Sequence, residues 1–142
     1  MKKIVGSMLV VFALMFLLSG VSQASTYRLG TDVFGCEWWA EYIESGVSKN
    51  GVAYDSIAII IFIADNPQAR TYYNVGTNIA MVGYLRYIDC TGRRWANVHT
   101  MSWDYDEDIV YDSGVNDTWT WMDCAAGTMM DKVLRVFCGA WK

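Results

Sequence analysis

The sequence predicts an α+β fold, in which a small antiparallel β-sheet carries one C-terminal helix packed on it and disulfides brace the domain. Three observations support this prediction. Short segments rich in β-branched and aromatic residues dominate the chain from Trp38 to Met122. Apolar residues recur at helical spacing near the end of the chain, and four cysteines are spread along it.

The first 24 residues have the pattern of a secretory signal peptide. Lys2 and Lys3 provide positive charge, an apolar run follows from Ile4 to Leu18, and Ser22-Gln23-Ala24 is a small-x-small cleavage site. This run of about 15 apolar residues is shorter than the roughly 20 that a membrane-spanning helix needs. We therefore expect cleavage after residue 24, a mature single domain of residues 25–142, and export to the periplasm or the extracellular space.

The charge of the mature chain argues against two classes of partner. Without Lys2 and Lys3, 9 basic residues stand against 15 acidic ones, which gives a net charge of −6. Proteins that bind nucleic acid present a basic surface to the phosphates, and anionic membranes attract basic segments in the same way. We expect neither a nucleic-acid partner nor stable membrane insertion.

The segment from Ile57 to Ile63 predicts the central strand. It is apolar, rich in β-branched residues and too short for a lone buried helix, so both of its faces should be covered. Asp65-Asn66-Pro67 supplies turn residues that end this strand. We expect the chain to continue as another strand from Arg70 to Val75, bounded by Gly76.

Thr91-Gly92 predicts a tight hairpin turn between two strands, Ile79 to Asp89 and Arg94 to Trp103. With a two-residue loop, residues of opposite charge and apolar residues face each other across the strands. The expected pairs are Asp89 with Arg94, Ile88 with Trp95 and Leu85 with Val98. Further short strands are expected at Trp38–Ile43, Ile109–Asp112 and Thr118–Met122.

The segment from Thr128 to Phe137 predicts the C-terminal helix. Thr128, with Asp131 three residues later, resembles a capping box at its start. The face that should pack on the sheet contains Met129, Met130, Val133, Leu134 and Phe137. Lys132 and Arg135 should point outward.

The four cysteines, Cys36, Cys90, Cys124 and Cys138, predict two disulfides in an exported domain. Their spacing leaves all three possible pairings open. A metal site is the competing interpretation. It is disfavoured because the chain has no C-x-x-C pair and its one histidine is His99, so we expect no metal and no other cofactor.

Several segments, taken in order, resemble the surface-adhesin protein E family of exported bacterial domains. The resemblance covers about Glu37 to Cys138 and includes a strand that ends in an Asp-Cys pair and a helix that closes on a Val-x-Cys sequence. The residues that carry it are Tyr54-Asp55-Ser56-Ile57, Tyr87-Ile88-Asp89-Cys90, Trp119 and Val136-Phe137-Cys138.

The resemblance implies an antiparallel sheet with a C-terminal helix and a disulfide between Cys90 and Cys138. Cys36 and Cys124 would then form the second disulfide. Adhesive members of the family are anchored by a lipid on an N-terminal cysteine, which this sequence lacks at the expected cleavage site. The family name therefore implies a fold more directly than it implies adhesion.

Two further patterns are better explained by structure than by chemistry. The acidic stretch Asp104–Asp108 resembles the start of a calcium loop, but Ile109 and Val115 replace the glycine and glutamate that such a loop requires. We expect a solvated turn there. His99 is expected to be structural, because no sequence signature links it to a nucleophile.

The aromatic residues point towards binding. The chain contains 7 tryptophans and 9 tyrosines, and Trp38 and Trp39 should point to opposite faces of one strand. Exposed aromatic rings are common anchors of protein interfaces. We expect an exported, non-enzymatic domain that engages a protein ligand and has no catalytic residues, with unknown binding residues. The alternative is a periplasmic inhibitor or stress-related factor that blocks a hydrolase through a rigid, disulfide-braced loop, and a hydrolase ranks last.

Overall fold

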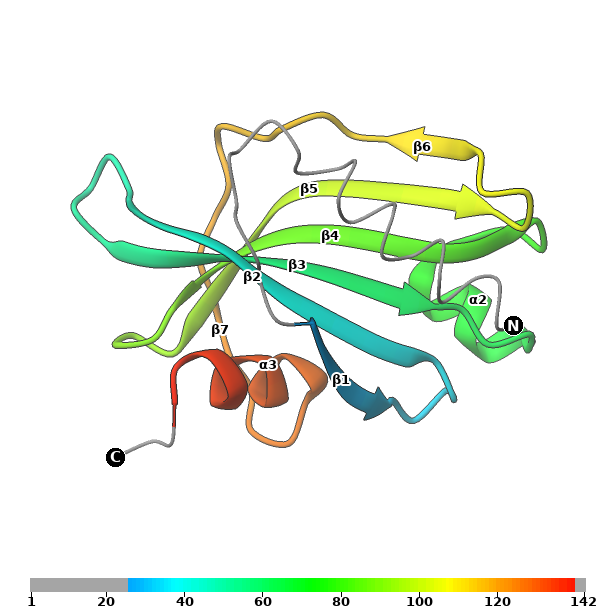
Figure 1. The fold of residues 1–142 in the computed structure, drawn as a ribbon, viewed down its shortest axis with the longest axis horizontal. Helices are drawn as coiled ribbons and strands as arrows, with labels where there is room; N and C mark the ends of the chain where they lie inside the picture. Colours follow the sequence, from blue (N-terminus) through cyan, green and yellow to red (C-terminus); the bar gives the residue numbers. More distant parts are fainter. Residues whose placement is uncertain (1–25, 140–142) are drawn as a thin grey trace.

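A computed structural model describes residues 26–139, and the expected signal peptide lies outside these residues. The expected α+β fold is confirmed: an antiparallel sheet carries a C-terminal helix, and one disulfide joins the two (Figure 1). The sheet order is β1-β2-β3-β4-β5-β6, with β7 paired to β5. Its strands are β1 (Thr26–Thr31), β2 (Glu37–Val47), β3 (Ala53–Phe62), β4 (Ile79–Asp89), β5 (Arg94–Asp104), β6 (Ile109–Asp112) and β7 (Met122–Asp123).

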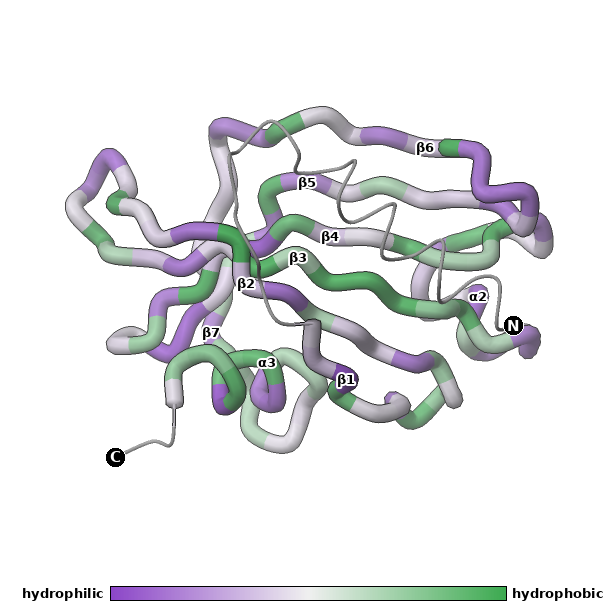
Figure 2. Tube along the Cα trace, viewed as in Figure 1, coloured by the Kyte–Doolittle hydropathy of each residue, from purple (hydrophilic) through white to green (hydrophobic). Residues whose placement is uncertain are grey.

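The central strand is β3, as its apolar sequence predicts, and it pairs with β2 on one side and β4 on the other. Hydrophobic residues follow one another along β3 (Figure 2). Because successive side chains of a strand point to opposite faces, β3 contributes to the cores on both sides of the sheet. Ile57, Ile59 and Ile61 lie in the larger core with both helices, while Ala58 and Ile60 lie in the core of the other face.

The hairpin between β4 and β5 has the predicted register beside its turn. Asp89 pairs with Arg94 and Ile88 pairs with Trp95. The prediction for Leu85 was wrong, because a β-bulge shifts the register and places this residue opposite His99. An extra residue in one strand moves every later pair by one position, which an alternating sequence does not reveal.

The segment from Arg70 to Val75 was expected to be a strand, but its first part belongs to helix α2 (Pro67–Tyr73). The Asn66 side chain accepts a hydrogen bond from the Ala69 N–H at 2.8 Å, and Pro67 occupies the start of the helix. Asn74 ends it in the left-handed conformation, with φ of 54°. The Asn-Pro sequence is therefore a helix start as well as the end of a strand.

Helix α3 (Met129–Phe137) confirms the predicted C-terminal helix. The Thr128 hydroxyl caps it by accepting the Asp131 N–H. Val133 and Leu134 are fully buried against the sheet, whereas Lys132 and Arg135 are exposed. In Figure 1, α3 lies beside the sheet edge formed by β1 and β2, and it contacts both strands.

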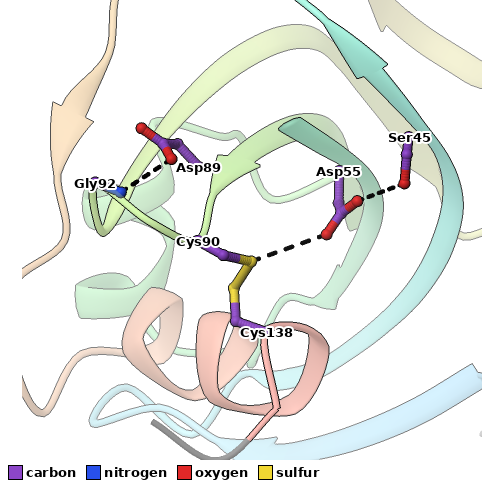
Figure 3. Close-up of a disulfide and its surroundings, with 6 residues drawn as sticks. All are labelled: Ser45, Asp55, Asp89, Cys90, Gly92 and Cys138. Atoms are coloured by element: carbon purple, nitrogen blue, oxygen red, sulfur yellow. Dashed lines mark hydrogen bonds between the residues drawn. A yellow bond between two sulfur atoms is a disulfide. The ribbon is translucent and has the colours of Figure 1, made fainter. Parts of the chain in front are cut away.

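The predicted disulfide between Cys90 and Cys138 is present and ties the end of α3 to the end of β4 (Figure 3). The two cysteines are 48 residues apart in sequence. Closing a loop of that length stabilises the fold by about 4 kcal/mol on the chain-entropy model. Asp55, which accepts a hydrogen bond from Ser45, lies 3.8 Å from the Cys90 sulfur through its second oxygen.

The expected disulfide between Cys36 and Cys124 is absent, and both residues are free thiols. The strand register aligns Cys36 with the Met81 end of β4 and Cys124 with its Asp89 end. From Met81 to Asp89 the strand extends about 26 Å, at roughly 3.3 Å per residue. The Cα atoms of disulfide-bonded cysteines lie within about 7 Å of each other. Pairing by elimination fails because an even cysteine count does not require every cysteine to be oxidised.

Two other strands differ from expectation. The predicted strand from Thr118 to Met122 is reduced to Met122–Asp123, which pairs with the start of β5. The first strand, β1, was not predicted, because its sequence mixes polar residues with Gly30 and lacks a clear alternation. It pairs with β2 through a register shift next to that glycine.

Candidate functional site: an aromatic cleft between the two helices

A cleft of about 680 Å³ lies on the face of the sheet that carries both helices. Its size is within the usual range of ligand pockets. Strands β2, β4 and β5 form its floor, the turn after β1 and helix α2 form one wall, and the segment from β7 into α3 forms the other. Six aromatic side chains line it: Phe34, Trp38, Tyr72, Tyr73, Tyr84 and Trp95.

Arg86 is the cation on the floor of this cleft. Its guanidinium lies 4.1 Å from the centre of the Tyr84 ring and 4.3 Å from the centre of the Trp95 ring. Its Nε donates a hydrogen bond to Asn97 Oδ1 at 3.2 Å. These contacts fix the plane of the guanidinium by cation–π attraction and one hydrogen bond. Burial lowers the pKa of Arg86 to about 10, so the side chain is still protonated at neutral pH.

Asp32 holds the wall between β1 and β2 in place. One carboxylate oxygen accepts the backbone N–H groups of Phe34 and Cys36, each at 2.9 Å. The other accepts the indole N–H of Trp38 at 3.1 Å and the hydroxyl of Tyr73. Burial, followed by the bond to Asp32, raises the pKa of Tyr73. This carboxylate therefore joins the turn, the sheet and α2 into one rigid wall, and its lone pairs are occupied.

The rim of the cleft is more exposed than its floor. The Tyr72 ring on α2 is 64% exposed and packs against Phe34, with ring centres 4.6 Å apart. Across the cleft, α3 presents Met129, Met130 and the exposed Lys132. The opening therefore presents apolar and aromatic surface around the half-buried guanidinium of Arg86.

A second group of aromatic residues, outside this cleft, has a structural role. Tyr54 of β3 and Tyr87 of β4 stack with ring centres 4.0 Å apart. Trp119 packs edge-on against both rings, and Trp121 packs against Trp119. These contacts attach the long segment between β6 and β7 to the sheet, although that segment has little strand structure of its own.

The residues that the sequence offered for chemistry lie outside the cleft. His99 on β5 is hydrogen-bonded through Nε2 to Asp112 on β6, so this pair joins two neighbouring strands. The Asp104 carboxylate accepts hydrogen bonds from the backbone N–H groups of Asp106 and Asp108, and these bonds stabilise the solvated turn between β5 and β6. Within residues 26–139, no three histidine, cysteine, aspartate or glutamate side chains gather as metal ligands do.

The cleft is not evident from the sequence, because its residues come from distant segments. Trp38 was predicted to lie on the face of the strand opposite Trp39, and the structure places Trp38 in the helix-covered core and Trp39 in the other one. A signal was available at Arg86. It lies between Tyr84 and Ile88 at alternating positions of a predicted strand, so a cation had to share their face.

Comparisons of the chain with protein-family models, with curated proteins and with solved structures find no significant match. The fold and the cleft together define a disulfide-linked α+β domain with an open aromatic cleft. Among the described residues, no helix has the length and apolar character needed to cross a membrane.

Proposed function

We propose that this protein is an exported, non-enzymatic binding domain of the surface-adhesin protein E type, which engages a protein ligand in the periplasm or at the cell surface. One observation carries the proposal. Six aromatic side chains and one unpaired guanidinium meet in an open cleft of ligand-binding size. Aromatic residues and arginine are the residue types that most often dominate binding energy at protein interfaces.

The construction of the cleft favours binding over catalysis. Of the two aspartates that line it, Asp32 already accepts four hydrogen bonds and is not available as a general base, while Asp123 is exposed to solvent. The histidine–aspartate pair of β5 and β6 lies elsewhere and joins the two strands. The rigid walls give a ligand a preformed surface, which reduces the entropy lost on binding.

The proposal is tested by capture with matched variants of the mature domain. Tyr72→Ser removes an exposed ring at the rim of the cleft, while Tyr111→Ser removes a similarly exposed ring on β6, outside it. An envelope extract of the source cells is passed over each immobilised protein, and retained proteins are identified by mass spectrometry. We expect a partner that the wild type and Tyr111→Ser retain and Tyr72→Ser loses. Equal retention by all three proteins would refute cleft-dependent binding.

A second candidate is an inhibitor of a hydrolase. It is favoured by the disulfide at Cys90, which anchors one end of the exposed turn that contains Thr91 and Gly92. A rigid exposed turn suits insertion into an enzyme cleft. This function predicts that a captured hydrolase loses activity when the protein is added, and that Tyr72→Ser inhibits it as well as the wild type does.

A further inference from the structure

We infer that the cleft accepts the carboxyl terminus of its protein ligand, so that the terminal carboxylate pairs with Arg86 and the last apolar side chain packs against the aromatic walls. This inference rests on the proposed function, because it names the part of the ligand that the cleft recognises. Four observations support it: the pairing of the arginines, the position of Arg86, the charges around it and the shape of the walls.

Arg86 is exceptional among the arginines of residues 26–139. Each of the others forms an ion pair with a carboxylate, and these pairs are Arg28–Glu37, Arg70–Asp65, Arg93–Asp131, Arg94–Asp89 and Arg135–Asp131. Arg86 has only the neutral amide of Asn97 and two aromatic rings as partners. An unpaired guanidinium in a binding cleft is the expected complement of an anion from a ligand.

The two terminal nitrogens of Arg86 are the groups that remain for that anion. Its Nε is taken by Asn97, and the Tyr84 and Trp95 rings leave the edge of the guanidinium plane as the site for hydrogen bonds. Two N–H groups on one planar edge match the two oxygens of a carboxylate. Because the side chain is already fixed, little rotamer entropy is lost when that pair forms.

The charges that line the cleft favour a singly charged anion. Two cations, Arg86 and Lys132, share the cleft with two carboxylates, Asp32 and Asp123. A phosphate dianion would meet the same two cations and a stronger repulsion from both carboxylates, which disfavours it. A carboxylate carries one charge and needs one guanidinium.

The walls favour a chain end over an acidic side chain in the middle of a peptide. The cleft is bounded on one side by Phe34 and Tyr72 and on the other by Met129 and Met130. A chain end can enter between these walls with one strand of backbone and present its carboxylate first. Its last side chain then meets apolar and aromatic surface, so a leucine or phenylalanine at that position gains buried area.

The test uses three short peptides and the fluorescence of the cleft tryptophans. The first is an acetylated tetra-alanine segment that ends in leucine with a free carboxyl terminus. The second is the same peptide with an amidated terminus, and the third is the amidated peptide with an internal glutamate. We expect the first to bind at least tenfold more tightly than the second and the third, because a charge-assisted hydrogen bond to a carboxylate contributes that much.

Two variants locate the effect. Arg86→Gln should reduce the preference for the free carboxyl terminus to less than twofold, whereas Lys49→Gln removes a positive charge from an exposed turn outside the cleft and should retain the preference. If the wild-type protein bound the peptide with the free carboxyl terminus and the amidated peptide equally tightly, that result alone would overturn the inference. So would tighter binding of the glutamate peptide or of inorganic phosphate.

The outcomes separate this inference from the proposed function. If the free-terminus peptide does not bind, but the capture experiment still yields a partner that depends on Tyr72, the carboxylate inference is wrong and the cleft remains a binding site. If no partner depends on Tyr72 and the peptide does not bind, both are wrong. If the peptide binds with the expected preference but no partner is captured, the inference stands and the extract lacked the ligand.

Discussion

Single residues explain how an acidic domain leaves one arginine of residues 26–139 without a carboxylate partner. Five arginines form ion pairs with carboxylates, and a single carboxylate, Asp131, pairs with both Arg93 and Arg135. The Asp32 carboxylate accepts hydrogen bonds from two backbone N–H groups and two side chains, so it has no free lone pair to pair with Arg86. Each of the other five arginines in the described part of the chain is paired with a carboxylate, whereas Arg86 contacts only Asn97 and two aromatic rings.

Asp131 should make the stability of the fold depend on pH in the acid range. The Gly127 N–H, and then Arg135 and Arg93, hold the pKa of this carboxyl below its usual 3.8. A carboxyl with a lowered pKa in the folded state stabilises the fold above the unfolded pKa, and this contribution is lost as pH falls through the folded pKa. The stability difference between the wild type and Asp131→Asn should therefore shrink below about pH 4, as urea melts from pH 7 to pH 2 would show. A constant difference over that range would contradict this role.

Gly83 on β4 is a position where no side chain fits. A Cβ added there would lie 2.8 Å from Cζ3 of Trp103 and 3.0 Å from Cδ1 of Ile60. Both neighbours are buried. Gly83→Ala should therefore lower the free energy of unfolding by about 1–3 kcal/mol, the usual cost of overpacking.

Urea melts of a second variant test the cause of that loss. Adding Trp103→Phe to Gly83→Ala removes the ring atoms that clash, so the double variant should lose less stability than the sum of the two single changes. Strict additivity would mean that the glycine is needed for its backbone and not for space.

At the scale of elements, local patterns predicted the structure where one pattern dominated. The apolar run of β3 and the helical spacing of α3 were both recognised, because each is strong within about ten residues. Helix α2 was missed, because Tyr72 and Tyr73 suggest a strand while the Asn66-Pro67 start suggests a helix, and the cap prevailed. The β-bulge in the hairpin and the short β7 depend on long-range pairing, which local propensity does not contain.

Helix α3 should show the contrast between its buried and exposed faces. Leu134→Ala removes a fully buried side chain and should cost about 2–5 kcal/mol in unfolding free energy, because it leaves a cavity. Lys132→Ala, on the exposed face, should change it by less than about 0.5 kcal/mol. Denaturant melts with the disulfide intact measure both, and equal effects would mean that α3 is not docked through this face.

At the scale of the whole molecule, the sequence revealed the class of the fold but not its site. The cleft brings together Phe34, Tyr72, Tyr84, Arg86 and Trp95 from three separate elements and a turn, so no local sequence pattern predicts it. The cysteine count likewise suggested two disulfides, whereas the topology brings only one pair together. The alternation of side chains along a strand does predict that Tyr84 and Arg86 lie on the same face of β4.

The state of the cysteines is a direct check of this topology. Unfolding the mature domain without a reductant should expose two thiols, from Cys36 and Cys124. In the folded protein, Cys36 is fully buried, and burial raises the pKa of its thiol, so it should not react with an alkylating reagent. Mass spectrometry after alkylation gives the count, and zero thiols in the unfolded protein would show that the second disulfide forms after all.

We propose that ligands enter the cleft between α2 and α3. The most direct test of this proposal is a titration of the ¹⁵N-labelled mature domain with the peptide that ends in a free carboxyl group, followed through the indole N–H signals of the tryptophans. We expect the signals of Trp95 and Trp38, which line the cleft, to shift with a common affinity, while those of Trp119 and Trp121 stay in place. Shifts confined to Trp119 and Trp121, with Trp95 and Trp38 unchanged, would contradict it.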